Sequence, residues 1–117
     1  MNNNKELKGA YKQYKPDMGV YVFRCVPTGR AYIGYGQNMK ADINSITFQL
    51  NLGSFISNRA CGLQGVWKEF GEANFEVAVV ESLEYAKDES KTDYSDDLKV
   101  LREVCSEKFG LFEFIQK

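Results

Sequence analysis

Two short runs of β-branched and aromatic residues, separated by a turn, constrain the fold of this chain more than any other feature. Residues 18–25 read MGVYVFRC and residues 31–35 read AYIGY, with Pro27-Thr28-Gly29 between them. Such runs on either side of a turn that contains proline and glycine are typical of a β-hairpin. The sequence therefore predicts two antiparallel strands joined by a short turn.

The predicted hairpin carries one tyrosine on each strand, Tyr21 and Tyr32, and each has a glycine nearby. Antiparallel neighbours lie about 5 Å apart, so the two tyrosines are within reach of each other across the pair. Because glycine has no Cβ, Gly19 and Gly34 allow another backbone or a phosphate to approach closely. Cross-strand aromatic pairs also stabilise sheets, so the tyrosines are compatible with a structural role as well as with a site.

Four segments place apolar residues at the three- and four-residue spacing of one helix face. Pro16, Gly53 and Gly71 are the expected ends of the first three helices. Ser95 is the candidate N-cap of the fourth. The apolar stripes are Leu7, Ala10, Tyr11 and Tyr14; Ile43, Ile46 and Leu50; Leu63, Val66, Trp67 and Phe70; and Leu98, Leu101, Val104 and Cys105.

A third strand is predicted over NFEVAVVESL, residues 74–83. Its continuous apolar run from Val77 to Val80 favours a central position in the sheet. The predicted order is helix, hairpin, helix, helix, strand, helix. We therefore expect one domain over residues 1–117, of mixed α/β (α+β) class, with a three-stranded antiparallel sheet flanked by helices.

Composition excludes several classes of protein. No apolar run approaches the roughly 18 residues of a membrane span, and the first residues do not resemble an export signal, so we expect a cytoplasmic protein without a membrane partner. Cys25, Cys61 and Cys105 are widely spaced, and the chain has no histidine that could join them in a zinc site. Reduced, mostly buried thiols are the favoured interpretation.

The net charge of −1 is unevenly divided along the chain. Residues 1–60 hold eight basic and three acidic residues, a balance of +5, and the remainder holds seven basic and thirteen acidic residues, a balance of −6. This asymmetry is compatible with a phosphate-facing side on a mildly acidic protein. It is equally compatible with two solvated faces.

GVY at residues 19–21 is followed by YIG at residues 32–34. This pair of motifs resembles that of the GIY-YIG nucleases. Further segments are similar, in the same order, to those of the small stand-alone bacterial members: KPDMGVY, FQLNLGS, LQGVWKEFGEANFE and KTDYSDDLKVLREV. The resemblance covers roughly Leu7 to Lys108, and it implies a GIY-YIG-like domain with the hairpin at its centre.

The resemblance also implies a metal-dependent phosphodiesterase of DNA, with branched or single-stranded regions among the candidate substrates. In the family, the first tyrosine is the base or proton relay for the attacking water and the second holds that water; Tyr21 and Tyr32 match them. Gly19 and Gly34 match the accompanying glycines. A glutamate on a later helix binds Mg²⁺ or Mn²⁺, and the Arg-Glu step of VLREV places Glu103 in that role. A tyrosine base needs a nearby cation, because its ordinary pKa is about 10.

Two positions depart from the family pattern. The arginine expected ten residues after the second tyrosine is Asp42, and the histidine often found one helical turn later is Ile46. A carboxylate at the first position would repel a phosphate. Arg59, or Arg24 and Arg30 beside the hairpin, could supply the missing cation, and these are the candidate substrate-binding arginines.

Two functions therefore remain open. The first is a small Mg²⁺-dependent DNA endonuclease that uses Tyr21, Tyr32, Glu103 and a non-standard cation. The second is a catalytically inactive relative that serves as a nucleic-acid- or protein-binding module. Glu103 itself has a second interpretation, because it falls on the polar flank of its helix beside Val100, where a solvated glutamate needs no function.

Overall fold

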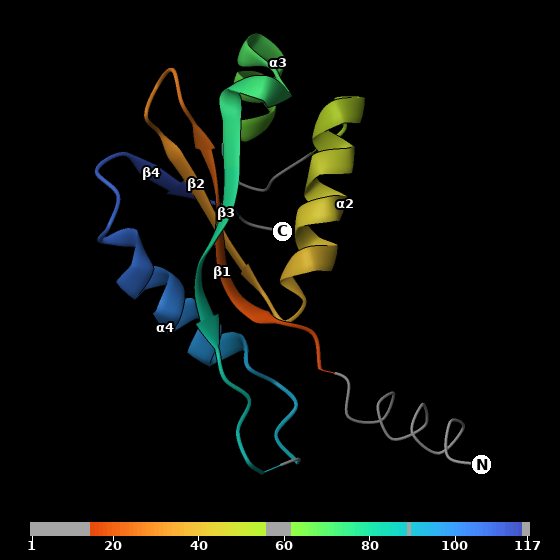
Figure 1. Ribbon diagram of the computed structural model, residues 1–117, viewed down its shortest axis with the longest axis vertical. Coiled ribbons are helices and arrows are strands. Elements are labelled where there is room, and N and C mark those ends of the chain that lie inside the picture. Colours follow the sequence, from red (N-terminus) through yellow and green to blue (C-terminus); the bar gives the residue numbers. More distant parts are fainter. Residues whose placement is uncertain (1–14, 56–61, 89, 116–117) are drawn as a thin grey trace, which may run out of the picture.

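The computed structural model describes residues 15–55, 62–88 and 90–115. The helix predicted around Leu7 to Tyr14 lies outside these residues. The described part of the chain forms a mixed α+β fold around an open sheet (Figure 1). Its elements are β1 (Met18–Cys25), β2 (Ala31–Gly36), α2 (Met39–Leu52), α3 (Leu63–Phe70), the short 3-10 helix η1 (Glu72–Asn74), β3 (Phe75–Leu83), α4 (Ser95–Ser106) and β4 (Phe112–Phe114).

The predicted hairpin is confirmed. Strands β1 and β2 pair antiparallel, with Tyr21 opposite Gly34 and Phe23 opposite Tyr32. Gly29 has a φ of 74°, and its N–H donates to the carbonyl of Cys25 over 2.8 Å. A left-handed glycine is well suited to such a tight reversal. The register places both motif tyrosines on the same face of the sheet, since directly opposite residues share a face.

The sheet has four strands among the described residues, in the order β3-β1-β2-β4, where the sequence predicted three. The fourth strand, β4, pairs parallel with β2, so the sheet is not purely antiparallel. Three residues are too few to show a period-two pattern, which explains why β4 was missed. The α+β class predicted from the sequence is confirmed, and the strand count is corrected.

The prediction that β3 is central is wrong. Strand β1 occupies the centre, and β3 pairs with it at the edge of the sheet. Val77 and Val79 of β3 are 41 % and 52 % exposed. A continuous apolar run is consistent with a strand covered on both faces, but it does not identify the neighbours of that strand.

Helices cover both faces of the sheet (Figure 1). On one face, α2 and α3 pack over Tyr21, Phe23 and Tyr32, with Leu50 and Trp67 as their buried contributions. On the other face, α4 packs over a second cluster formed by Val20, Val22, Ala31, Ile33 and Cys105. The alternation along β1 thus assigns successive side chains to two different cores.

The predicted ends of the second and third helices are confirmed. Gly53 ends α2 in a left-handed conformation with a φ of 74°, and its N–H is directed at the carbonyls of Gln49 and Leu50. Gly71 ends α3, and its N–H donates to the carbonyl of Trp67 over 2.8 Å. These glycine caps satisfy carbonyls that the helices leave unpaired.

Two details of α4 differ from expectation. Ser95 is the first helical residue, and Tyr94 is the N-cap, so the predicted serine cap is wrong. Asp93 Oδ1 instead accepts from both the backbone N–H and the hydroxyl of Ser95, over 2.9 and 2.7 Å. Val104, predicted to face the core, is 55 % exposed, because the buried side of α4 is centred on Leu98 and Cys105.

Cys25 and Cys105 are buried free thiols, as predicted, and Cys61 lies outside the described residues. Burial raises the pKa of the Cys105 thiol, which favours the neutral form. Within the described ranges, none of the helices is both long enough and apolar enough to cross a membrane.

We expect two glycine substitutions to change stability in opposite directions. A Cβ at Gly34 would lie 2.6 Å from Tyr21 Cε1, so Gly34→Ala should lower the free energy of unfolding by about 1–3 kcal/mol through overpacking. Gly65 lies inside α3, and an added methyl group would meet nothing within 4 Å. Gly65→Ala should therefore raise the free energy of unfolding by about 0.5–1 kcal/mol. Urea unfolding measures both changes; equal effects would contradict the close packing at Gly34.

Candidate functional site

A cavity of about 750 Å³ opens at the end of β2. Its walls come from four places: the end of β2 with the following loop, the first turn of α2, the first two turns of α4, and Ile115 just after β4. The size lies within the range of ligand pockets, and charged groups of both signs line it. The lining residues are Tyr35, Gly36, Gln37, Asn38, Asp42, Ser95, Leu98, Lys99, Arg102 and Ile115.

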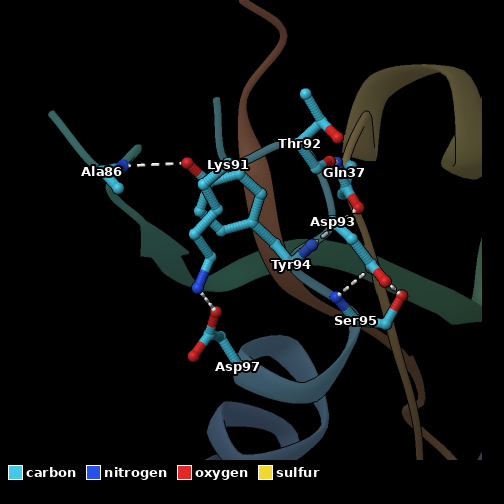
Figure 2. A network of polar contacts seen from close by, with 8 residues as sticks. All are labelled: Gln37, Ala86, Lys91, Thr92, Asp93, Tyr94, Ser95 and Asp97. Carbon is cyan, nitrogen blue, oxygen red and sulfur yellow. Dashed lines mark hydrogen bonds and ion pairs between the residues drawn. The ribbon is translucent and has the colours of Figure 1, made fainter. Parts of the chain in front are cut away.

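The amide of Gln37 holds two walls of this cavity together. Its Nε2 donates to the carbonyl of Thr92 over 3.0 Å, and its Oε1 accepts from the backbone N–H of Tyr94 over 3.1 Å. Figure 2 shows this network at the start of α4. One side chain thereby joins the loop after β2 to the chain that leads into α4, although the two are more than fifty residues apart in sequence.

Tyr94 holds the start of α4 in place through its hydroxyl and its ring. It is 4 % exposed, and its hydroxyl accepts from the backbone N–H of Ala86 over 2.9 Å (Figure 2). The ring of Tyr85 packs edge-on against it, with 5.4 Å between ring centroids. Lys91 lies over the ring and pairs with Asp97 over 2.7 Å. The start of α4 is therefore fixed by contacts with the segment after β3.

Tyr21 is fully buried and does not line the cavity. Its ring lies against Gly34, where a Cβ would meet three of its atoms within 3 Å. Its hydroxyl is buried and has no hydrogen-bond partner in the described part of the chain. Burial first, then the carboxylate of Asp42 and the phenol of Tyr35, raise its pKa above the ordinary value. All three effects disfavour a tyrosinate.

Tyr32 is also buried, at 1 % exposure, and belongs to the apolar cluster under α2. Ile46, at the position where the resemblance implies a histidine, is 2 % exposed and belongs to the same cluster. The motif tyrosines thus share one face, as predicted, and that face is packed against α2 in the structure.

Asp42 lines the cavity from the first turn of α2. Its carboxylate lies directly over Gly36, where a Cβ would collide with Oδ2. The position favours a negative charge, because the first turn of a helix carries the positive end of its dipole. Asn38 caps the same turn by accepting from the N–H of Ala41 over 3.1 Å. The structure therefore places a carboxylate where the resemblance implies an arginine.

Arg102 and Lys99 bring positive charge to the same cavity from α4. The guanidinium carbon of Arg102 lies 4.0 Å from the ring centroid of Phe114 and 5.0 Å from that of Tyr35. Its Nε is buried and has no hydrogen-bond partner among the described residues. Sequence reasoning missed Arg102, although its spacing of four residues from Leu98 places both on one helix face.

Glu103, the expected metal ligand, is exposed and does not line the cavity. The neighbouring position that does face the cavity carries the positive charge of Arg102. The described ranges contain no group of three or more His, Cys, Asp or Glu side chains placed to hold a metal. Glu103 thus lies outside the cavity, without two further ligands of these types placed to join it among the described residues.

Two of the predicted substrate-binding arginines, Arg24 and Arg30, lie away from the cavity. Arg24 pairs with Glu76 over 2.9 Å and Arg30 with Glu113 over 3.3 Å. Both flank the hairpin turn, at the opposite end of β2 from the cavity. Arg59 lies outside the described residues.

Gly19 has a packing explanation. A Cβ at this position would collide with the backbone carbonyl oxygen of Glu81 on β3. The β1–β3 register shifts immediately afterwards, between Val20 and Tyr21, which marks a β-bulge. A side chain at Gly19 would therefore separate the two strands.

Comparison with known proteins identifies the fold. The catalytic domain of homing endonuclease I-TevI matches 79 % of this chain and 87 % of its own length, with a TM-score of 0.60 and 17 % sequence identity. A single-residue mutant of the catalytic domain of intron endonuclease I-TevI matches 71 % of this chain and 84 % of its own, with a TM-score of 0.50 and 21 % identity. No family model and no curated protein matches the chain. The similarity confirms the GIY-YIG resemblance at the level of the fold.

Proposed function

We propose that this protein is a non-cleaving relative of the GIY-YIG nucleases that binds DNA. One observation carries the first half of the proposal: the Tyr21 hydroxyl is buried beside the carboxylate of Asp42. In the nuclease family that the chain resembles, the matching tyrosine takes a proton from the attacking water. The environment of Tyr21 opposes that role.

A general base must reach its substrate and must be able to accept a proton. The Tyr21 hydroxyl is closed off from solvent, and its raised pKa keeps it protonated at neutral pH. A cation nearby would lower the pKa of a phenol, whereas the carboxylate of Asp42 adds to the effect of burial and raises the pKa of Tyr21.

Glu103 adds further support for the absence of cleavage. It stands on the exposed side of α4, and Arg102 occupies the cavity side next to it. A divalent cation at the cavity would meet a guanidinium instead of a carboxylate from this helix. The surroundings of Tyr21 and the exposed position of Glu103 together support the proposal that the protein does not hydrolyse DNA.

The second half of the proposal, DNA binding, rests on the fold and on two basic side chains. The solved structures that share the fold are catalytic domains of a homing endonuclease. Lys99 and Arg102 line the cavity, and neither forms an ion pair with another described residue. Unpaired cations on a concave surface are suited to the phosphates of duplex, branched or single-stranded DNA.

We expect the protein to bind DNA without nicking it. Supercoiled plasmid incubated with the protein and Mg²⁺ or Mn²⁺ should remain intact. Labelled duplex, single-stranded and branched DNA should bind at about 50 mM salt and dissociate steeply towards about 200 mM, because bound phosphates release counterions. Nicking by the unaltered protein that is lost in Tyr21→Phe would overturn the first half of the proposal. Failure to bind any DNA at the lower salt concentration would overturn the second half.

Two tyrosine substitutions test whether the Tyr21 hydroxyl is a passive core group. Tyr21→Phe removes a buried hydroxyl without a described partner, so it should raise the free energy of unfolding by about 1 kcal/mol. Tyr94→Phe is the matched control, because it removes an acceptor that pairs with the Ala86 N–H and should lower stability by about 1 kcal/mol. Thermal or urea unfolding measures both. A destabilised Tyr21→Phe would show that this hydroxyl has a partner on which the fold depends.

A further inference from the structure

We propose that Arg102, with Lys99 one turn before it, is the phosphate-binding site of this protein and replaces the cation that α2 lacks. The inference rests on the proposed DNA binding and assigns that binding to a site. The resemblance implies a positive side chain on the helix after the hairpin and a negative one on the later helix. In this chain the signs of the two side chains that face the cavity are exchanged. Helix α2 presents the carboxylate of Asp42 to the cavity, and α4 presents the guanidinium of Arg102.

The side chain of Arg102 is held in place before any ligand arrives. Its guanidinium carbon lies 4.0 Å from the Phe114 ring centroid and 5.0 Å from the Tyr35 ring centroid. Aromatic contacts of this kind fix the plane of a guanidinium. Fixing the side chain in advance lowers the conformational entropy lost when an anion binds.

The buried Nε–H of Arg102 lacks an acceptor in the described part of the chain. Arg102 forms none of the ion pairs found there, and its Nε has no hydrogen-bond partner. Because a buried donor left unpaired is unfavourable, an incoming acceptor would relieve an existing penalty. The same unpaired donor distinguishes Arg102 from Arg24 and Arg30, whose guanidinium groups already pair with Glu76 and Glu113.

Phosphate is the acceptor that fits this arrangement. The planar fork of arginine donates two parallel hydrogen bonds to two phosphate oxygens, and the ammonium of Lys99 adds a point charge from the same helix face. Asp42 lines the α2 side of the cavity, and the two basic side chains among its lining residues stand on the α4 side. Either an internal phosphodiester of DNA or a terminal phosphate supplies this chemistry.

The first experiment measures DNA affinity in matched variants. Arg102→Leu keeps apolar contact with the rings of Tyr35 and Phe114 and removes the guanidinium. DNA binding should therefore weaken about tenfold, and the number of ions released on binding, measured from the salt dependence, should fall by about one. Arg24→Leu removes an arginine that is already paired, and its affinity should stay within about twofold of the wild-type value. Unfolding curves of both variants establish that the measurements compare folded proteins.

Arg102→Lys separates the fork from the charge. Lysine preserves the positive charge but cannot donate in parallel, so its affinity should fall between those of the wild type and Arg102→Leu with an unchanged salt slope. Duplexes that carry 5′-phosphate or 5′-hydroxyl ends identify the source of the phosphate. Equal affinities indicate an internal phosphodiester, and tighter binding of the phosphorylated duplex indicates a terminal phosphate.

A second experiment is independent of DNA. Inorganic phosphate is titrated into the protein while the Nε–H signal of Arg102, assigned from its absence in Arg102→Lys, is followed by NMR. A saturating shift supports the site, even if the protein binds no DNA and the proposed function fails. DNA binding that Arg102→Leu leaves unchanged, or a signal that phosphate does not move, would overturn the inference while leaving DNA binding intact.

Discussion

Two glycines on β2 determine how the rest of this site is packed. Gly34 and Gly36 lie two residues apart on the same face of the strand, and each leaves a space that another residue fills. The ring of Tyr21 lies over Gly34, and the carboxylate of Asp42 lies over Gly36. Because the spaces adjoin, the phenol and the carboxylate are brought close enough for the charge of Asp42 to raise the pKa of Tyr21. The sheet therefore joins the motif tyrosine to Asp42, the position at which the chain departs from the pattern that the resemblance implies.

The electrostatic character of the cavity follows from the two helices that border it. A carboxylate in the first turn of α2 is favoured by the helix dipole, which stabilises Asp42 where it stands. On α4, the rings of Tyr35 and Phe114 hold a guanidinium that no described carboxylate neutralises. The fold is shared with an endonuclease domain, while the described charges that face the cavity are negative on its α2 side and positive on its α4 side.

The features that could be predicted from the sequence are those with a local cause. The hairpin follows from two β-rich runs around a turn, and the ends of α2 and α3 follow from Gly53 and Gly71. The remaining features depend on tertiary contacts. Strand β4 is too short to show a sequence pattern. Strand β3 is an edge strand because β1 pairs with both β2 and β3 and takes the central position. The resemblance directed attention to Glu103, whereas the helix rotation fixed by Leu98 turns Arg102 towards the cavity. A charged residue that faces a cavity can be recognised in a sequence only when the buried side of its helix is already known.

The role of Gln37 has a consequence for the chemical ageing of the molecule. Its amide uses the oxygen to accept from Tyr94 and the nitrogen to donate to Thr92, so both halves of the group are needed. Deamidation would replace the nitrogen by a second oxygen, which would face the carbonyl of Thr92 with no proton between them. A one-atom change on the loop would then loosen the wall that carries α4, and the cavity would lose its shape while both cores of the sheet stayed packed.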